Sequence, residues 1–560
     1  MILGVARGLL CFALASVLGI AAFAPAAGAS DPNAYTLTQT YIASSNGVKL
    51  HTAVFRPAGA GPTAKTPVIL TVSPYFTSGM TPLGPYDPSG NPTPTPGSFA
   101  ERASVFAHGY SVVQVALRGY GASTGCYDEG GPGERQDVKR AVEWAASQPW
   151  STGRVGMVGH SYDAQTQLMA LGMHPKGLAA VVPSAAPAGY ANFFSAGVST
   201  VTGRAFGAFY GVSDLLPPST KAPASQQVNA AHGPLSYPTC YATTPVGTYS
   251  DRADSRYWRD RDLGALAAGT TIPVMAEQGF DDFNVRSSNF TAFWSGLKGP
   301  KRAFLGPWDH GLSHDGPGNT FETLRWLDAW VKNDPAAQAY ERAAPPITVQ
   351  DIDGRYRAEE TWPPADAVGK AFRIRSGDYL DSAVNFSENG LPPAVTGAAG
   401  LKKAPTPLPT GVGTWTFSQP LAQSLRISGQ PSARVHVRSV APRTTLIALL
   451  YDVAPNGNAK FVGRGGRLLR ARGEQTVTVT LYPNDWEFAP GHRVGLLLTG
   501  SDGVWLETGN TGTVVHVIGG SLVLPALTQP RTAFLPGGPY PVLPQIPPFR
   551  ISPQTIRQRS

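Results

Sequence analysis

Charged side chains are few in this sequence, at 15% of 560 residues, whereas 63 glycines and 52 prolines make up about a fifth of it. That balance excludes a coiled coil, a long helical bundle and a charge-rich disordered chain. Basic clusters are also missing, because the net charge of +8 comes from scattered arginines without the Lys/Arg runs of nucleic-acid-binding arms. With 42% hydrophobic residues, a chain of this length predicts at least two globular domains.

The only long apolar run is at the start of the chain. Residues 9–24 are apolar except for Ser16, and Ala27-Gly28-Ala29 supplies the small residues that a signal peptidase needs. A run of about sixteen residues is short for a membrane core of about 30 Å, which makes a retained anchor the weaker alternative. We therefore expect a signal peptide at residues 1–29, cleavage near Ala29, and a secreted mature chain without a membrane segment.

Export changes the interpretation of the three cysteines. Cys11 would leave with the signal, so the mature chain would have Cys126 and Cys240, an even number in an oxidising compartment. A disulfide between them would close a loop of 240 − 126 = 114 residues. In the chain-entropy model such a loop contributes about 4–5 kcal/mol. Two buried thiols are the alternative.

Short apolar strands alternate with amphipathic helices from about residue 35 to 340. After two strand-like stretches in residues 35–57, strands are expected at 67–73, 110–117, 154–159, 178–185, 272–278 and 302–306. Helices are expected at 134–148, 162–173, 284–297 and 320–333. Strands buried on both faces and separated by helices predict a mostly parallel sheet in an α/β domain.

Two segments depart from this alternation. Residues 188–268 are rich in Gly, Ala, Ser, Pro and aromatic residues, with helix-like pieces and no clear strand, which favours a cap inserted over the carboxyl edge of the sheet. Beyond the prolines at 345 and 346, β-rich runs separated by Gly, Pro and Asn turns predict a β-sandwich of the jelly-roll type at 346–560. The α/β domain is then expected in two parts, at 30–187 and 269–345.

Two serines compete for the role of a nucleophile. Ser123 lies in a complete Gly-x-Ser-x-Gly string, but a loop rather than a helix follows it. A nucleophile elbow needs its serine on a sharp turn directly between a strand and a helix, which exposes the hydroxyl above the sheet. Ser161 has that context, since the strand at 154–159 leads into it and helical spacing follows. Ser161 is therefore the candidate nucleophile, with the Tyr162 N–H as an oxyanion donor, and an ordinary N-cap serine is the alternative.

A base and an acid are expected in loops after two later strands. Asp281 and Asp282 follow the strand at 272–278, and His310 follows the strand at 302–306. Their order after Ser161 is the nucleophile–acid–base order of α/β-hydrolases, and both loops lie at carboxyl ends of strands, where α/β sheets build their sites. The other histidines considered are His160 inside the elbow, His174 after the next helix, and His314 as a reserve base.

At this point the sequence resembles a known family, the CocE/NonD-type α/β-hydrolases that include Xaa-Pro dipeptidyl-peptidases (peptidase family S15) and cocaine-esterase-like acyl hydrolases. The likeness spans nearly the whole mature chain. An ordered series of short motifs carries it: Pro74-Tyr75, RGYGASTG at 118–125, Glu143-Trp144 with Gln148-Pro149-Trp150, GMVGHSY at 156–162, Asp282-Phe283-Asn284, GPWDH at 306–310 and Trp362-Pro363-Pro364.

The resemblance implies an α/β-hydrolase fold with a cap and a C-terminal sandwich, and a triad of Ser161, Asp282 and His310. It also implies that the hydroxyl of Tyr75 joins the Tyr162 N–H in the oxyanion hole, although Tyr75 could instead fill space under the loop at 77–98. It implies no metal or organic cofactor. The substrate would be a short peptide or a small molecule, and the resemblance leaves the oligomeric state open.

Dipeptidyl-peptidase action needs a carboxylate that captures a substrate ammonium, usually from the cap. Candidates in the cap are Asp214, Asp251, Asp254, Asp260 and Asp262, and no motif selects among them. Cleavage of carboxylic esters is the alternative activity, and a secreted binding protein on a catalytically dead hydrolase scaffold is the alternative from another class.

One position departs from the family pattern. The family usually has glycine two residues after the nucleophile, where this chain has Asp163. Either the helix lies further from the sheet, or Asp163 is hydrogen-bonded near the site and recognises a substrate amine. Two other residues have milder interpretations: Trp308 as a pocket wall or packing residue, and Arg118 as part of a buried ion pair that shapes the loop beneath the site.

Overall fold

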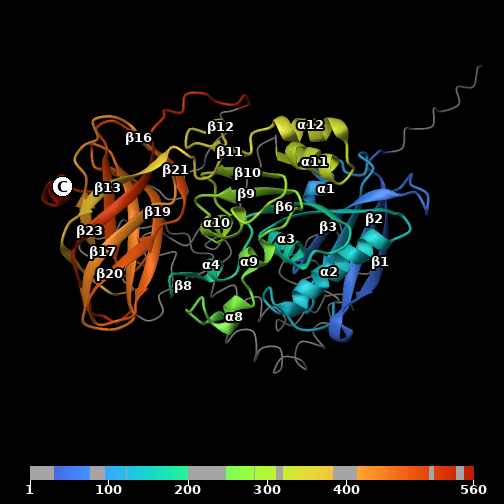
Figure 1. The fold of residues 1–560 in the computed structure, drawn as a ribbon, viewed down its shortest axis with the longest axis horizontal. Helices are drawn as coiled ribbons and strands as arrows, with labels where there is room; N and C mark the ends of the chain where they lie inside the picture. The colour runs from blue at the N-terminus through green and yellow to red at the C-terminus, as the bar shows by residue number, and fades with distance from the viewer. Residues whose placement is uncertain are drawn as a thin grey trace, which may run out of the picture.

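The computed structural model describes residues 31–75, 95–120, 123–199, 247–282, 284–310, 319–382, 413–502, 510–537 and 548–560. Within these ranges, Figure 1 shows a large sheet covered by helices at one end of the molecule and a β-sandwich at the other. None of the helices in the described ranges has the length and hydropathy needed to cross a membrane. The predicted signal peptide lies outside the described residues, as does Cys240, so its disulfide with Cys126 stays a prediction.

The large sheet has ten strands. In spatial order they are β1 (Tyr35–Ala43), β2 (Lys49–Pro57), β4 (Ser111–Ala116), β3 (Thr66–Ser73), β5 (Ser151–His160), β6 (Leu178–Ser184), β9 (Val274–Gly279), β10 (Lys301–Gly306), β11 (Ile347–Gln350) and β12 (Tyr356–Glu359). Strands from β4 to β11 in this order run parallel, and the pairs at both edges are antiparallel. The predicted parallel sheet is therefore confirmed.

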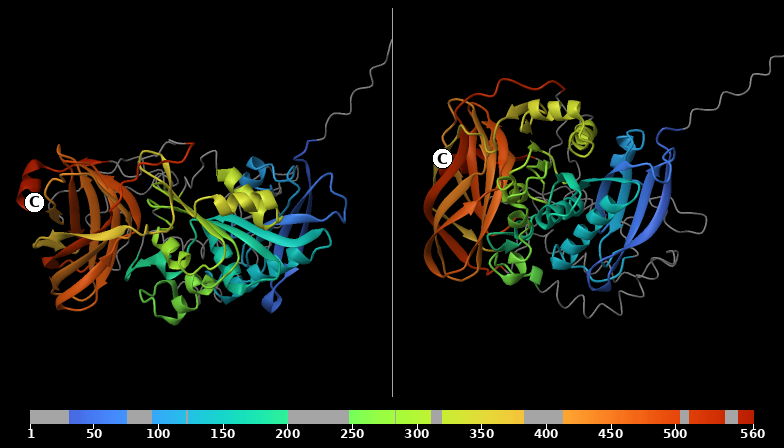
Figure 2. Two further views of the ribbon diagram at one scale, coloured as in Figure 1. Left: turned by 45° about the horizontal axis from the view of Figure 1, so that its top comes forward. Right: turned by 45° about the vertical axis from the view of Figure 1, so that its right-hand side comes forward.

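Helices cover both faces of this sheet, which is why its central strands are apolar along their whole length. One face packs against α1 (Ser98–Arg102) and α11 (Asn319–Trp330). The other packs against α2 (Pro132–Ser147), α3 (Tyr162–Met173), α9 (Leu263–Ala267) and α10 (Ser288–Trp294). Figure 2 shows the sheet between these two layers. The remaining helical elements of the first 345 residues are η1 (Ser45–Gly47), α4 (Tyr190–Phe193), α8 (Arg256–Arg259) and α12 (Pro335–Ala343).

The strand order places a candidate binding site at the carboxyl ends of two neighbouring inner strands, β3 and β5. The chain passes from β3 to β4 on one side and then returns to β5 on the other side of β3. The connections therefore leave β3 and β5 in opposite directions. A place where the strand order reverses in this way is called a topological switch point. Open α/β sheets bind their ligands in the crevice at the carboxyl ends of the strands on either side of it. Tyr75 follows β3 and Ser161 follows β5 at this edge.

The C-terminal part of the chain is a sandwich of two antiparallel sheets, and this prediction is also confirmed. One sheet holds β13 (Ala367–Ile374), β14 (Gly377–Leu380), β16 (Leu425–Gly429), β17 (Ser432–Ser439), β20 (Gly473–Thr480), β21 (Asn484–Phe488) and β23 (Val514–Leu527). The other holds β15 (Thr414–Phe417), β18 (Thr444–Val453), β19 (Asn458–Leu469), β22 (Arg493–Thr499) and β24 (Phe549–Arg550). The inner faces of the two sheets share one apolar core, and α14 (Pro553–Arg559) ends the chain.

The structure differs from the predicted domain limits in two places. The large sheet continues beyond residue 346 through β11 and β12, so the predicted start of the sandwich is too early. The change in texture at 345–346 marks the end of α12, after which the fully buried β11 pairs with β10. In the cap segment, two-residue strands that the sequence did not indicate, β7 (Phe194–Ser195) and β8 (Val198–Ser199), form a small hairpin.

A buried ion pair fixes the loop after β4, as the sequence suggested for Arg118. Its Nε and Nη2 atoms donate to the two oxygens of Asp137 on α2 at 2.6 and 2.8 Å, and both side chains are buried. We expect Arg118→Ala to lower the free energy of unfolding by about 3–5 kcal/mol, because it leaves the Asp137 carboxylate buried without its counter-charge. Urea unfolding of the purified protein measures this loss.

The matched control is a partly exposed ion pair on the same helix. Lys139 and Glu143 interact four residues apart, with 29% and 27% of their side chains exposed. Lys139→Ala should therefore cost less than about 0.5 kcal/mol. If Arg118→Ala and Lys139→Ala lowered the free energy of unfolding by similar amounts, burial of the Arg118–Asp137 pair would not be the reason for its larger contribution.

Candidate active site

Ser161 occupies a sharp turn between β5 and α3. Its backbone has φ 61° and ψ −121°, a left-handed conformation that is strained for a residue with a Cβ atom. The turn is held by the Ser161 N–H, which donates to the Ser184 carbonyl oxygen at 2.9 Å, and by the Ser161 carbonyl, which accepts the first hydrogen bonds of α3. The geometry is that of a nucleophile elbow, with the amino end of α3 directed at the serine.

A continuous line of hydrogen bonds joins Ser161 to the two side chains predicted with it. Nε2 of His310 lies 3.0 Å from Oγ of Ser161, and Nδ1 of His310 lies 2.9 Å from Oδ2 of Asp282. His310 comes from the loop after β10 and Asp282 from the loop after β9. Both loops reach the same carboxyl edge of the sheet as Ser161, although the three residues are far apart in the sequence.

The structure distinguishes the two adjacent aspartates. Oδ1 of Asp282 accepts the backbone N–H groups of Asn284 and Val285 at 2.9 and 2.7 Å, which leaves Oδ2 directed at His310. Asp281 instead lies near Arg464 of the sandwich, and burial raises its pKa to about 6. Of the two aspartates, it is therefore Asp282 whose carboxylate contacts the His310 imidazole.

The neighbouring histidine in the elbow has a different environment. The His160 ring lies 4.5 Å from the His310 ring, centroid to centroid, and its Nδ1 is 3.2 Å from the Ser184 hydroxyl. Burial, followed by repulsion from a charged His310, lowers the pKa of His160 to about 4, so the ring stays neutral at physiological pH. His174 is the left-handed C-cap of α3, and His314 lies outside the described residues.

Ser123, the serine in the complete motif, has its hydroxyl committed to the scaffold. Its Oγ accepts the N–H of His51 at 2.8 Å and donates to the carbonyl of Ala116 at 2.8 Å. The side chain is 3% exposed, so no substrate could reach it. The expectation that Ser123 is structural agrees with this geometry.

The two residues expected at the oxyanion hole flank the elbow. Tyr162 is the first residue of α3 and directly follows Ser161, the N-cap of this helix. Its ring points away from the edge, and its hydroxyl donates to Oε2 of Glu134 at 2.7 Å. Tyr75 lies two residues beyond β3 with its ring against the main core. The sequence did not predict the contact of Tyr162 with Glu134. The one sequence signal at Glu134 is that an acidic residue lies in the first turn of α2.

Trp308 packs against the ends of two strands. A Cβ atom on Gly306 would lie 1.8 Å from Cζ3 of Trp308, and one on Gly279 would lie 2.7 Å from Cδ1 of the same indole. The indole therefore lies directly over both glycines, and it is buried. This contact shapes the turn between β10 and His310, as expected of a packing residue.

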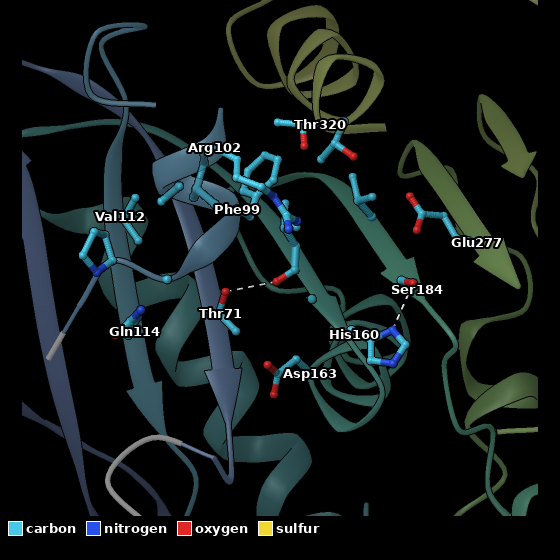
Figure 3. Close-up of a pocket in the computed structure, with 18 residues that line it drawn as sticks. Thr71, Phe99, Arg102, Val112, Gln114, His160, Asp163, Ser184, Glu277 and Thr320 are labelled. Atoms are coloured by element: carbon cyan, nitrogen blue, oxygen red, sulfur yellow. Dashed lines mark hydrogen bonds between the residues drawn. The ribbon is translucent and has the colours of Figure 1, made fainter. Parts of the chain in front are cut away.

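Asp163, expected near the substrate, faces a cavity of about 290 Å³ between the sheet and the helices α1 and α11. Figure 3 shows it beside Thr71 and His160, which line the same cavity. Among the described residues, neither Ser161 nor His310 lines this cavity. Burial raises the pKa of Asp163 to about 7.

The acidic residues of the cap are engaged elsewhere. Asp251 forms ion pairs with Arg443 and Arg470 of the sandwich, with the Arg443 contact at 2.7 Å. The other three described acids pair locally or cap a helix: Asp254 with Arg252, Asp260 with Arg256, and Asp262 at the start of α9. Asp214 lies outside the described residues. Within the described ranges, no group of three or more His, Cys, Asp or Glu residues could hold a metal ion.

Comparison with known families matches both halves of the chain. The model of the S15 family of X-Pro dipeptidyl-peptidases matches residues 46–312, and the model of the X-Pro dipeptidyl-peptidase C-terminal non-catalytic domain matches residues 341–522. The two matches lie in the order expected for one protein of this kind.

Individual relatives are distant and cover most of the chain. A putative Xaa-Pro dipeptidyl-peptidase of Bacillus cereus is 23% identical over 84% of this chain and 86% of its own length. The cocaine esterase of a Rhodococcus species is 24% identical over 87% and 94%. Among solved structures, a CocE/NonD family hydrolase from Staphylococcus aureus superposes with a TM-score of 0.66 at 15% identity, covering 88% of this chain and 94% of that one. The predicted α/β-hydrolase fold with a C-terminal β-sandwich is confirmed.

Proposed function

The chain belongs to the CocE/NonD-type α/β-hydrolases that include the S15 X-Pro dipeptidyl-peptidases, and on this premise we propose that it is a secreted serine hydrolase working through an acyl-enzyme. The observation that carries the proposal is the hydrogen-bonded line from Ser161 through His310 to Asp282. A hydroxyl, an imidazole and a carboxylate in this order can activate an oxygen nucleophile near neutral pH.

The reaction has two halves. Oγ of Ser161 attacks the carbonyl carbon while its proton passes to Nε2 of His310, and the bond to the leaving group breaks as that proton is delivered to it. Water then attacks the acyl carbon, gives its proton to His310, and the acid leaves as Ser161 regains its proton. Asp282 holds the Nδ1–H tautomer and stabilises the imidazolium that forms in each half.

Developing negative charge on the substrate oxygen needs fixed donors. The N–H of Tyr162, at the amino end of α3, and the hydroxyl of Tyr75 are the donors in this proposal. Removing one such donor from an oxyanion hole typically lowers kcat by about 10²- to 10³-fold. The position of Tyr75 after β3, beside the strand that carries Ser161, supports this role.

Cleavage after Xaa-Pro dipeptides is the leading substrate proposal, because the catalytic and the C-terminal family models both describe X-Pro dipeptidyl-peptidases. Hydrolysis of carboxylic esters is the second candidate. The contacts of the cap aspartates favour this candidate. Those in the described residues form ion pairs with arginines or cap a helix, so they are not available to bind a substrate ammonium.

Three substrates separate these activities. We expect hydrolysis of Ala-Pro-anilide and a loss of at least about 100-fold in kcat/KM when its amine is acetylated, because an unpaired buried anchor costs several kcal/mol. Phenyl acetate is the third substrate. Hydrolysis of phenyl acetate with no activity on either anilide would support the esterase, and a lack of reaction with a fluorophosphonate would support the dead scaffold.

Secretion belongs to the same proposal and rests on the composition of residues 1–29. Amino-terminal sequencing of the protein from the culture medium of the expressing cells should begin at or near Ser30.

A further inference from the structure

A buried hydrogen bond joins the residue after the nucleophile to the neighbouring helix. The hydroxyl of Tyr162, at the start of α3, donates to Oε2 of Glu134, in the first turn of α2, at 2.7 Å. Tyr162 is 3% exposed and Glu134 is 0% exposed. Water therefore does not compete for either partner, and breaking the bond would leave a buried polar group without a replacement. The bond fixes the position of the phenol ring at the start of α3.

The carboxylate of Glu134 is itself held by the loop before α2. Its Oε1 accepts the backbone N–H of Asp128 and its Oε2 accepts the backbone N–H of Gly130, both at 2.8 Å. Arg261 of the cap holds the same loop, because its Nε and Nη2 donate to the carbonyl of Asp128 and its Nη2 also donates to the Asp128 carboxylate. Glu134 is thus a fixed acceptor, which cannot follow the Tyr162 ring if that ring moves.

The loop also lies directly against α3. Gly130 has φ 72°, and a Cβ atom at this position would lie 2.9 Å from Nε2 of Gln165 on α3. A side chain at 130 would therefore push the loop and the helix apart. The close approach places the backbone N–H of Gly130 and the hydroxyl of Tyr162 on the same carboxylate oxygen of Glu134.

The turn at Ser161 needs such support because its backbone is strained. A residue with a Cβ atom keeps φ 61° and ψ −121° only where the surrounding structure enforces them. The ψ angle of Ser161 sets the plane of the peptide that carries the Tyr162 N–H. If the turn relaxed, this N–H would rotate, and an error of about 1 Å in a catalytic group can cost about 100-fold in rate.

We propose that Glu134 is a positioning residue for catalysis, which holds the Tyr162 side chain and thereby keeps the N–H of Tyr162 directed at the oxyanion that forms when Ser161 attacks. This inference rests on the proposed serine-hydrolase function and deepens it. It assigns a role to a buried glutamate on α2 that takes no part in the proton transfers between Ser161, His310 and Asp282.

The competing explanation is that the bond only stabilises the fold. A buried tyrosine on the same sheet provides the matched control, since the hydroxyl of Tyr110 donates to Oδ1 of Asp328 at 2.8 Å and Tyr110 is 0% exposed. Tyr110 directly precedes β4, at the amino ends of the parallel strands, whereas Ser161 lies at their carboxyl ends. The same substitution can therefore be made near and far from the site.

The first experiment compares Tyr162→Phe with Tyr110→Phe on p-nitrophenyl acetate. Both should lower the Tm, because each removes one buried hydroxyl bond. Tyr162→Phe should lower kcat at least about 10-fold with KM changed less than about 2-fold, whereas Tyr110→Phe should keep kcat within about 2-fold of the wild type. An unchanged kcat in Tyr162→Phe, or an equal loss in Tyr110→Phe, would overturn the proposal.

A second measurement reports on the oxyanion hole itself. Butylboronic acid forms a tetrahedral adduct with a catalytic serine and so resembles the transition state, which binds more tightly than the substrate. In Tyr162→Phe its inhibition constant should rise by about the same factor as kcat falls. A loss of kcat with an unchanged inhibition constant would place the defect outside the oxyanion hole and overturn the proposal.

Substitutions of Glu134 test whether it acts through Tyr162. Glu134→Gln retains a carbonyl oxygen that can accept from the Tyr162 hydroxyl and from the Gly130 N–H, so kcat should stay within about 3-fold of the wild type. Glu134→Ala should lose about as much kcat as Tyr162→Phe, and the double variant should lose less than about 3-fold more than either. Losses that multiply in the double variant would overturn the proposal. Circular dichroism melts identify any variant that fails to fold, and if Glu134→Ala fails, Tyr162→Phe with its boronate measurement decides.

Failure of the underlying function gives a different result. If the wild type hydrolyses no ester or anilide and Ser161→Ala changes nothing, the proposed function fails. If Ser161→Ala abolishes turnover but Tyr162→Phe leaves kcat and boronate inhibition unchanged, the hydrolase stands and the positioning role of Glu134 is wrong.

Discussion

Replacing Ser161 with alanine is expected to lower kcat by about 10⁴- to 10⁶-fold on any substrate that the protein hydrolyses. The hydroxyl lies 3.0 Å from Nε2 of His310, so its loss removes the nucleophile and the proton that His310 would accept. The fold should persist, because both serine and alanine have a Cβ atom and the strain of the left-handed turn is unchanged.

Active-site labelling and turnover measure this effect together. A fluorophosphonate probe should label the wild type and leave the Ser161→Ala protein unlabelled. The control is Ser123→Ala, in the complete Gly-x-Ser-x-Gly string, which should retain labelling and kcat while losing about 1–2 kcal/mol of stability with its two hydrogen bonds. Labelling that depends on Ser123 instead of Ser161 would contradict the assignment.

The second large effect is expected for Asp282→Asn, with a fall in kcat of about 10⁴-fold. The reason lies in the two backbone N–H groups that donate to Oδ1 of Asp282. An asparagine would present its carbonyl oxygen to those donors and so turn its NH₂ group toward His310. Nδ1 would then become an acceptor and Nε2 would carry the proton, so the imidazole could not accept the proton of Ser161.

The adjacent aspartate provides the control for this substitution. Asp281→Asn changes the same charge one residue away, at a carboxyl whose pKa burial already raises to about 6. Its effect on kcat should stay below about 10-fold. Steady-state kinetics on the preferred substrate, with thermal melts of both variants, tests the difference, and a larger loss in Asp281→Asn would reverse the assignment of the acid.

Local sequence patterns were sufficient to predict the parts of the site that depend on chain order. Ser161 is preceded by a strand and followed by a helix, and Asp282 and His310 each follow a buried strand. In a parallel sheet all such positions meet at one edge, so local periodicity alone places the three residues on the same side. The role proposed for Tyr75 has no local signal in the sequence and rests on the resemblance to a family.

Contacts between distant segments could not be predicted in this way. The hydrogen bond between Tyr162 and Glu134 depends on which elements are neighbours. Sequence periodicity gives no information on that choice. The predicted boundary between the α/β domain and the sandwich was too early for the same reason. In the sequence β11 is one more β-rich run, and only its pairing with β10 assigns it to the large sheet.

The pairing within the sandwich has a consequence for biosynthesis. β13 pairs with β23, so that Ala367 is the partner of Leu527, which lies 160 positions further along the chain (527 − 367 = 160). A ribosome must therefore reach Leu527 before this sheet can close, whereas every strand of the large sheet has been made by Glu359. Non-local pairings of this kind form slowly. The unpaired strands are the segment for which a nascent chain most needs protection from aggregation during synthesis.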